Sequence, residues 1–535
     1  MPEAKAAPSL LILAEPLLRE GLIRLLERSY GIQTDGTPAE GSPQLVIWSA
    51  DADVPLQTLQ RELLQLRERW QPAPVLLLLS GHAPHSSDDL LQLPCDGLLQ
   101  QAEPEEIPTT VATLLAGGRV VELRPLSAAP AEPEPNGFGQ WLLRSSLRQI
   151  QAEQERCRIW LQQCPGGLSA LLLRGRLREL AAARRLLLWL WGPLSMAFPE
   201  ETTAPSSGLV RAPGLGISLR QRTAEGVWQA IRERLVAVID AGITNRSGQL
   251  LALDGLNANH RRDLLLALLS QLDLLITRLR HEQLRGEELE ERWLQQQPDL
   301  RRLSLRAMAG EYVQLPQQGG LLPVADSLSQ ASQLTGLDPD LPLALPMLAA
   351  LVQAQPLLVE GRLLAPDEPQ ALLHLEHLIA NWLIRSAELI SAEILACCSG
   401  WPELRRYLLR GDLLATRNLE RLRNQLNSQQ RWGSLFERPV QLYESQRLLY
   451  TLQGGAITPL LLTEPRDAEL RQLSWSQQLI TLSLEARDAL APQLQSFVRR
   501  LGDLVVVLLT QVVGRAIGLV GRGILQGMGR TVGRS

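Results

Sequence analysis

The sequence lacks the features that are typical of secreted and membrane proteins. Its five cysteines are odd in number and show no Cys-x-x-Cys spacing, which fits neither a disulfide framework nor a zinc site and indicates a reducing compartment. The first residues, MPEAKAAPSLLILAEP, lack a basic region that leads into a long apolar core, so we expect no signal peptide. No clean apolar run reaches the roughly 20 residues that a transmembrane helix needs. These absences predict a cytoplasmic protein.

Lysine and aromatic residues are also scarce. Lys5 is the only lysine, so nearly all positive charge is arginine, and the net charge is only -4. With 45% hydrophobic residues, the composition indicates neither wholesale disorder nor a basic surface that coats nucleic acid. A chain of 535 residues is too long for one hydrophobic core and predicts roughly two to four domains.

Between residues 9 and 123, short apolar runs alternate with amphipathic segments. The runs LLILA, QLVIWSA, PVLLLLSG and DGLLQ are bounded by polar turns and separated by segments such as LLREGLIRLLERS. This alternation is typical of a parallel sheet that helices cover on both faces. It predicts an α/β doubly wound, flavodoxin-like domain over residues 1–124. A Pro/Ala-rich linker follows over residues 125–137.

Beyond residue 137, leucines recur at intervals of three and four, with Arg, Glu and Gln on the opposite face. Convincing strands are not visible there. We therefore predict a large all-α helical domain over residues 138–535, with a sub-boundary in the loop-rich stretch at residues 198–222.

The order of the N-terminal segments resembles the receiver domain of DNA-binding response regulators. The resemblance covers roughly residues 8–124 and rests on LLILAEPLLREGLIRLLE, PQLVIWSAD, APVLLLLSGH, DGLLQQAEPEEI and LLAGGRVVE. It implies a fold in which phosphotransfer needs an acidic pair after the first strand, which holds magnesium, and an aspartate after the third. A Ser or Thr follows the fourth strand, and a lysine follows the fifth.

The residues at these positions depart from the family pattern. The family register places Leu13 and Ala14 at the acidic pair, Ser49 at the phosphoacceptor, Ser80 at the hydroxyl position, and Gln100 or Gln101 at the lysine. Without the carboxylates no magnesium ion neutralises an incoming phosphate, and a serine cannot form the acyl phosphate that receivers use. Glu15, Asp51 and Asp53 could still form an acidic cluster near the strand ends.

We interpret this part of the chain as a degenerate receiver, or pseudo-receiver. By family analogy, such a domain docks proteins through the helix-and-strand face near its C-terminal end. The usual appended helix-turn-helix is not visible after the linker, because the next segment is too long and is interrupted at CPGG.

The helical part contains one group of metal-ligating residue types. The motif HLEH puts His374 and His377 on one helical face, and nearby lie Glu376, Glu388, Glu393, Cys397 and Cys398. His and Glu at this spacing can ligate a metal in a helical bundle. No second Glu-x-x-His is visible, so a half-exposed polar face is the favoured interpretation, and we predict no metal and no cofactor. Cys397 and Cys398 are interpreted as core residues and not as nucleophiles, since no catalytic motif surrounds them.

The most polar region of the chain, residues 417–450, combines arginines with aromatic residues. It could bind a phosphate-bearing partner or stack on bases. It could equally form a structural network, for example Arg438 or Arg447 with Glu437 or Glu444. Nucleic acid is the less favoured partner, because no excess of basic charge accompanies the region. The candidate binding-surface residues are Arg417, Arg421, Arg423, Arg431, Trp432, Arg438, Tyr443 and Arg447.

A second resemblance covers roughly residues 225–535. The run NQLNSQQRWGSLFERPVQLYESQRLL, together with the C-terminal stretch, is similar to uncharacterised hypothetical reading frames of red-algal plastids and cyanobacteria. In that family a degenerate receiver often precedes a helical domain. The family has no established activity or catalytic residues, so the resemblance implies only a photosynthetic cell.

Glycines and arginines crowd the stretch VVGRAIGLVGRGILQGMGR near the C-terminus. The glycines recur at helical intervals, which predicts a Gly/Arg-rich amphipathic helix within residues 503–533 that packs on a partner helix or on a lipid surface. A full membrane span is disfavoured because Arg522 would lie deep in hydrocarbon. The residues that define this helix are Gly514, Arg515, Gly518, Arg522, Gly527 and Arg530. The cytoplasmic protein would then be peripheral to a membrane, such as the thylakoid.

Taken together, the sequence predicts a regulatory or assembly protein that is not an enzyme. Its pseudo-receiver would dock a protein partner without phosphorylation. One alternative is a transcription-type response regulator that binds nucleic acid through the arginine-rich region. A second alternative is a helical-bundle metal protein.

Overall fold

A computed structural model describes residues 8–33, 42–51, 53–81, 85–124, 215–317, 319–336 and 340–485. By their contacts these residues form two compact units. The first extends to Gln429 and includes Leu448–Leu462, whereas the second comprises Gln430–Arg447 and the chain from Thr463 onward.

The N-terminal part of the first unit is a seven-stranded sheet in the order β2-β1-β3-β4-β5-β6-β7. The strands are β1 (Ser9–Leu13), β2 (Gly31–Gln33), β3 (Leu45–Asp51), β4 (Val75–Ser80), β5 (Gly97–Gln100), β6 (Arg119–Leu123) and β7 (Leu215–Leu219). All neighbours pair in parallel except β7, which is antiparallel to β6. This arrangement confirms the predicted α/β fold of the N-terminal part.

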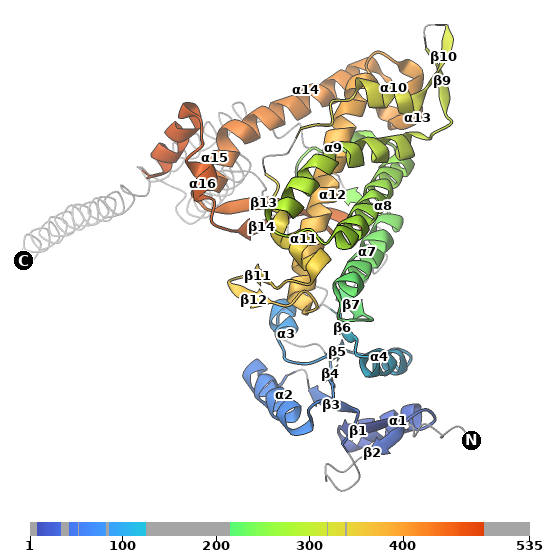
Figure 1. The fold of residues 1–535 in the computed structure, drawn as a ribbon, viewed down its shortest axis with the longest axis vertical. Helices are drawn as coiled ribbons and strands as arrows, with labels where there is room; N and C mark the ends of the chain where they lie inside the picture. The colour runs from blue at the N-terminus through green and yellow to red at the C-terminus, as the bar shows by residue number, and fades with distance from the viewer. Residues whose placement is uncertain are drawn as a thin grey trace, which may run out of the picture. The chain divides into compact units, whose positions relative to one another are not determined.

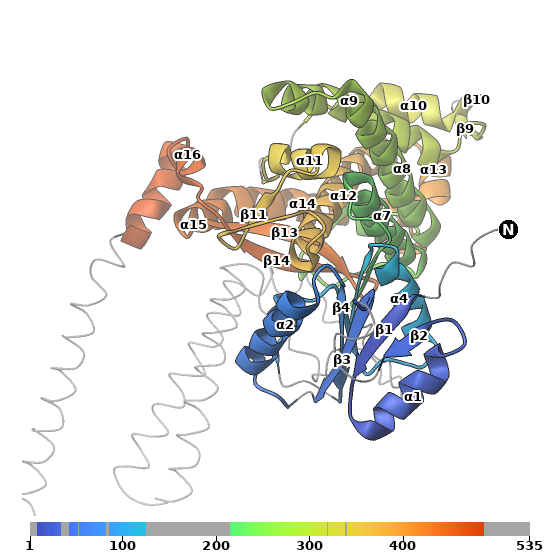
Figure 2. The ribbon, with the colours of Figure 1, turned by 60° about the horizontal axis from the view of Figure 1, so that its bottom comes forward.

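Helices cover both faces of this sheet, and this is why its strands read as continuous apolar runs. The helices are α1 (Pro16–Leu26), α2 (Leu56–Trp70), α3 (Ser87–Leu91) and α4 (Glu106–Leu115). Alternate residues of one strand enter different cores: Ile47 of β3 packs in the core that includes α1 and α4, whereas Val46 packs in the core that includes α2. Figure 2 shows α2 on one side of the strands and α1 and α4 on the other.

The rest of the described chain is mainly helical, as predicted. Its helices are α7 (Ala224–Asp240), α8 (Ala258–Glu282), α9 (Glu287–Ala309), α10 (Val324–Ala331), α11 (Ala344–Gln353), α12 (Pro369–Cys397), α13 (Pro402–Leu408), α14 (Thr416–Trp432), α15 (Arg438–Tyr443) and α16 (Asp467–Leu470). α12 is buried around most of its circumference, because α7, α8, α9 and α10 all contact it (Figure 1). A helix that is apolar on nearly every side belongs at the centre of such a bundle.

Strands beyond residue 137, which the sequence did not predict, do occur. Besides β7, they form the hairpins β9 (Gln314–Gln317)–β10 (Gly320–Pro323) and β11 (Leu357–Val359)–β12 (Arg362–Leu364), and a small sheet of β13 (Gln446–Gln453), β14 (Ala456–Thr463) and β8 (Thr244–Asn245). The turn at Glu360 and Gly361 has positive φ at both residues, and so does the turn at Gly454 and Gly455. Two-residue turns of this kind match the twist of a hairpin. The sequence did not reveal these hairpins, because their flanking residues are as rich in leucine as the helices.

Several predictions fall outside the described residues. The linker at residues 125–137 does so, as does the predicted C-terminal helix at residues 503–533 with its glycines and arginines. Of the proposed sub-boundary at residues 198–222, only residues 215–222 are described, and they include β7.

The pairing of β6 with β7 leaves no room for a side chain at Gly118. A Cβ atom on Gly118 would lie 2.4 Å from the carbonyl oxygen of Leu219, whereas a Cβ atom on Gly216 meets nothing within 4 Å. We predict that Gly118→Ala lowers the free energy of unfolding by about 1–3 kcal/mol, because the backbone must shift. The matched variant Gly216→Ala is expected to change it by less than about 0.5 kcal/mol. Denaturant unfolding of both variants, followed by circular dichroism, measures the difference; equal losses would contradict this account of the pairing.

Candidate functional site

The carboxyl ends of the parallel strands place one hydroxyl beside one carboxylate. β3 ends at Asp51 and β4 ends at Ser80, and these two residues are partners in the strand register. The Ser80 hydroxyl donates a hydrogen bond to Asp51 Oδ1 at 2.7 Å. Because parallel strands end at one edge of a sheet, this edge is where an α/β domain usually binds ligands.

Ser49, which the family register places at the phosphoacceptor, lies two residues before the end of β3 and pairs with Leu78. The structure therefore brings Ser80 together with Asp51 and not with Ser49. The sequence carried a signal for this, because the apolar run LVIWSA continues past Ser49 and extends the strand. For Asp51, at the end of β3, the sequence predicts only membership of an acidic cluster near the strand ends.

The other receiver positions lack charged groups. Leu13 ends β1, and Leu13 and Ala14 both pack against apolar core residues. Gln100 is buried, and its Oε1 accepts a hydrogen bond from the Arg124 backbone N–H at 3.1 Å. Gln101 has a left-handed backbone with φ of 52°. At this edge Ser80 thus keeps its hydroxyl, but the receiver positions of the magnesium-binding carboxylate pair and of the lysine carry Leu13, Ala14 and a glutamine.

The side of this domain around β5 and α3 contacts the chain's own helical part. Arg222 pairs with Asp96, which precedes β5, at 2.6 Å, and Arg119 of β6 donates to the Asp367 carbonyl at 3.2 Å. Arg362 of β12 donates to Gln92 Oε1 at 3.0 Å, and α12 contacts α3. The helix-and-strand face that family analogy assigned to partners is thus engaged, at least in part, within the chain.

Two residues of α12 with metal-ligating side chains, Glu376 and Glu388, serve the packing of the helical part. Glu376 is buried and accepts two hydrogen bonds from Arg234, at 2.6 and 3.3 Å. Glu388 accepts the backbone N–H groups of Ala252 and Leu253, each at 2.8 Å. Within the described ranges, no group of three or more His, Cys, Asp and Glu side chains is arranged to hold a metal ion. The geometry gives the metal-protein alternative no support.

Burial shifts the proton affinity of several of these groups. It lowers the pKa of His377 to about 4, with a smaller effect of Arg234 in the same direction. It raises the pKa of the Cys398 thiol to about 12, so this thiol is not a ready nucleophile at neutral pH. Burial also raises the pKa of Glu388 to about 7 in spite of its two backbone donors.

The arginine-rich region divides between surface and interior. On α14, Arg417 and Arg421 are exposed four residues apart, and Arg423 pairs with Glu420 at 2.9 Å. Tyr450, in the first unit, is buried. The Arg385 guanidinium lies over the Tyr450 ring, 4.7 Å from the ring centre, and the Tyr450 hydroxyl donates a hydrogen bond to Gln249 Oε1 at 2.5 Å. Tyr450 is therefore part of the core and not of a stacking surface.

In the second unit, Arg447 is buried and forms ion pairs with Glu464 and with Glu469, the latter at 2.8 Å. Glu469 also pairs with the buried Arg466 at 2.7 Å. The structural-network interpretation thus holds for Arg447, but the predicted partners Glu437 and Glu444 are wrong. The reason is that β14 brings Glu464 back beside β13, a long-range pairing that helical periodicity does not reveal.

Other members of the candidate surface in this unit are half-buried. Trp432 and Phe436 form a ring pair with centroids 4.3 Å apart, and Arg438 and Tyr443 are partly covered. Arg431 is exposed. Burial raises the pKa of Glu437 to about 7. The exposed part of the predicted surface is therefore smaller than the sequence suggested.

Comparisons with known proteins agree with both resemblances. Residues 338–529 match the family model described as a protein of unknown function, DUF3685, and residues 137–191 match the helical hairpin domain of cyanobacterial response regulators. A Ycf55-like protein of Synechocystis sp. is 29% identical over 97% of this chain and 96% of its own length. The uncharacterized protein ycf55 of Porphyra purpurea is 28% identical over 25% of this chain and 39% of its own length. A solved LuxR-family two-component response regulator from Aurantimonas sp. covers 22% of this chain and 89% of its own, with 20% identity and a TM-score of 0.18.

The fold and these matches give the class of the chain: an N-terminal α/β domain, a match to the helical hairpin of cyanobacterial response regulators over residues 137–191, and a largely helical region that carries a DUF3685 match. The chain is similar over nearly its full length to the Ycf55-like protein of Synechocystis and over a quarter of its length to ycf55 of Porphyra purpurea, which confirms the predicted resemblance to cyanobacterial and plastid reading frames. Among the described residues, no helix is long and apolar enough to cross a membrane.

The receiver positions predict how the chain responds to a small phosphodonor. Acetyl phosphate with magnesium is expected to leave its mass unchanged, because Leu13 and Ala14 supply no carboxylate for the metal. Intact-protein mass spectrometry checks this, with a receiver that has all five functional residues as the positive control. A phosphoryl adduct on Asp51 would show that one carboxylate suffices.

Glu388 predicts a pH dependence of stability. Its pKa rises from 4.5 to about 7 on folding, so its contribution to stability is complete below pH 4.5 and is lost as the pH rises through 7. Glu388→Gln should therefore gain stability relative to the wild type between these pH values, by on the order of 2–3 kcal/mol. His377→Asn should show the opposite trend and gain stability relative to the wild type as the pH falls. The reason is that the stability that neutral His377 provides is lost as the pH falls from 6.5 to about 4. Thermal unfolding across this range measures both; a constant offset for Glu388→Gln would show that Glu388 is ionised in the fold.

Proposed function

We propose that the chain is a non-enzymatic regulatory or assembly protein whose receiver-like domain acts without phosphorylation and docks a protein partner. The observation that carries this proposal is the carboxyl edge of the sheet, where Leu13 and Ala14 stand at the acidic pair and glutamines at the lysine position. The relationship to cyanobacterial response regulators supports a regulatory setting. A receiver that cannot take up phosphate can still act by binding other proteins through its surface.

Exposed leucines identify the docking surface in this proposal. Leu17 is 87% exposed and Leu18 40% exposed, both in the first turn of α1, directly after the carboxyl end of β1. Apolar side chains at this level of exposure on adjacent positions favour a protein contact. The side of the domain around β5 and α3 is already engaged by Arg222, Arg362 and α12.

The C-terminal Gly/Arg-rich segment, outside the described residues, is the second docking element of the proposal. In this role it packs on a partner helix or lies on the surface of a membrane such as the thylakoid. Partition of the chain between soluble and membrane fractions of the native cell, with and without residues 502–535, distinguishes these two contacts.

The docking surface predicts a selective loss of a partner. After crosslinking in the native cell, Leu17→Glu with Leu18→Glu should lower recovery of the bound protein about tenfold or more, because both leucines would lose apolar contacts. Leu64→Glu on α2 is the matched control, since Leu64 is 47% exposed on another helix. Quantitative mass spectrometry of the captured proteins reads out the difference. If the double variant and the control recover the same proteins in equal amounts, the docking surface is elsewhere.

A nucleic-acid-binding regulator is the second candidate. The exposed Arg417 and Arg421 on successive turns of α14 favour it, although the chain as a whole is acidic. Retention on DNA or RNA that weakens with salt and disappears in Arg417→Gln with Arg421→Gln would support this function over protein docking alone. Retention that persists in that variant would exclude α14 as the binding element.

A further inference from the structure

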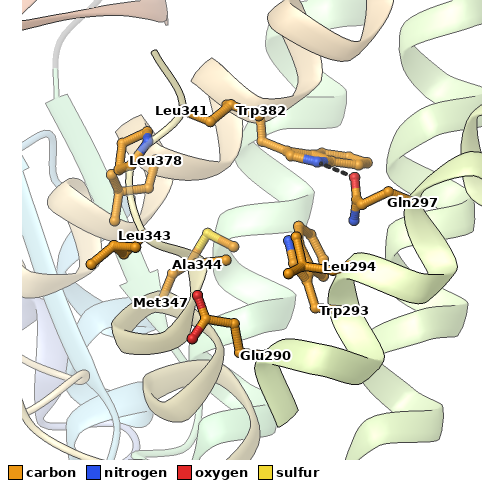
Figure 3. A pocket seen from close by; sticks show the side chains of 11 residues that line it. Glu290, Trp293, Leu294, Gln297, Leu341, Leu343, Ala344, Met347, Leu378 and Trp382 are labelled. Carbon is orange, nitrogen blue, oxygen red and sulfur yellow. Dashed lines mark hydrogen bonds between the residues drawn. The ribbon is translucent and has the colours of Figure 1, made fainter. Parts of the chain in front are cut away.

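A cavity of about 180 Å³ lies between α9, α11 and α12. One stripe of α9 forms one wall, with Glu290, Trp293, Leu294 and Gln297 at helical spacings of three, four and seven (Figure 3). The second wall is formed by residues 341–343, which precede α11, and by Ala344 and Met347 of α11. Leu378 and Trp382 of α12 form the third wall. Apart from Glu290 and Gln297, the lining is apolar. An apolar cavity of about 150 Å³ accepts one benzene ring, so this one accommodates a ring-sized group.

Gln297 places a hydrogen-bond donor in this apolar wall. The residue is 2% exposed, and its Oε1 accepts a hydrogen bond from Trp382 Nε1 at 2.9 Å. That bond fixes which end of the amide is the nitrogen, because the indole N–H can only donate. Gln297 Nε2 is buried and has no hydrogen-bond acceptor among the described residues. Figure 3 shows this nitrogen turned away from Trp382, toward the side on which Trp293 lies.

A buried amide nitrogen without an acceptor is costly, because it has lost its water and gained nothing in return. Native proteins keep few such groups, and those that exist call for an explanation such as a ligand. The two indoles beside it, Trp293 and Trp382, pack against each other with centroids 5.6 Å apart and planes tilted by 54°. Together they form one apolar wall against which a ring can lie.

Glu290 provides the second polar group of the cavity. It lies seven residues before Gln297 on α9, about 10 Å along the helix axis. Glu290 is partly exposed, and its carboxylate has no ion pair among the residues of the described ranges. Near an aromatic wall, an unpaired carboxylate favours a cationic or N–H-bearing group.

We propose that this cavity binds a small ring-containing molecule that carries a carbonyl-type acceptor at one end and an amine at the other. The ring lies against Trp293 and Trp382, the acceptor takes the N–H of Gln297, and the amine faces Glu290. The site is separate from the docking surface on α1 and does not depend on it.

The test uses the full-length chain and three probes: toluene, benzamide and para-aminomethylbenzamide. Saturation-transfer NMR titrations should show saturable binding of benzamide at millimolar concentration, tighter binding of para-aminomethylbenzamide, and weaker binding of toluene. Gln297→Met should weaken benzamide about tenfold and leave toluene unchanged, since only the hydrogen bond is lost. The matched control is Gln295→Met, an exposed residue on the same helix, which should change neither.

Glu290→Gln gives an independent readout at a partly exposed position, so it keeps the test decisive even where Gln297→Met fails to fold. It should abolish the advantage of para-aminomethylbenzamide over benzamide, and the exposed neighbour Glu291→Gln should retain it. The proposal is overturned if the wild type binds none of the probes saturably. It is also overturned if benzamide binds the folded Gln297→Met variant as tightly as the wild type, because the buried donor then selects nothing.

Discussion

The pairing of β6 with β7 is the constraint on which the first unit depends. Five residues on each side pair across a sequence separation of about ninety residues, from Leu123 opposite Leu215 to Arg119 opposite Leu219. Ile217 and Leu219 then enter the same apolar core as Val121 of β6 and Trp228 of α7. The sheet and the helical bundle therefore share one continuous core. An ordinary receiver could move relative to the domain after it; here the last strand of the sheet is also the start of the bundle.

Because it shares a core with the helices, the receiver-like domain differs from a receiver that switches on phosphorylation. In a switchable receiver, charge at the carboxyl edge is the input and a helix-and-strand face is the output. In this chain apolar residues stand at the positions of the acidic pair, Ser80 is bonded to Asp51, and the face around β5 is engaged by Arg222 and α12. The domain is thus packed as a structural part of the first unit.

Much of the fold could be predicted from sequence because the sheet is covered on both faces. Runs such as VLLLLS are apolar at nearly every position, and few other structures produce that pattern. The hairpins in the helical part could not be found in this way, because LLVEGRLL is as rich in leucine as the helices beside it, and only the two turn residues distinguish it. The site was predictable at Leu13, Ala14 and Ser80, which follow from strand order. Asp51 was not, since its place depends on where β3 ends, and neither were the partners of Arg447, which depend on a distant strand.

The antiparallel pairing of β6 with β7 also bears on which parts of the chain can be exchanged in evolution. Leu123 and Leu215 are direct neighbours across the ladder, so the end of β6 and the start of β7 lie at one place in the sheet. A segment inserted between two such neighbouring points does not change how the strands of the sheet connect. Such positions are where domains are gained or exchanged. The segment that matches the response-regulator helical hairpin, residues 137–191, sits within this insertion. Evolution could therefore vary or remove that module while the sheet and the bundle stay joined as one body.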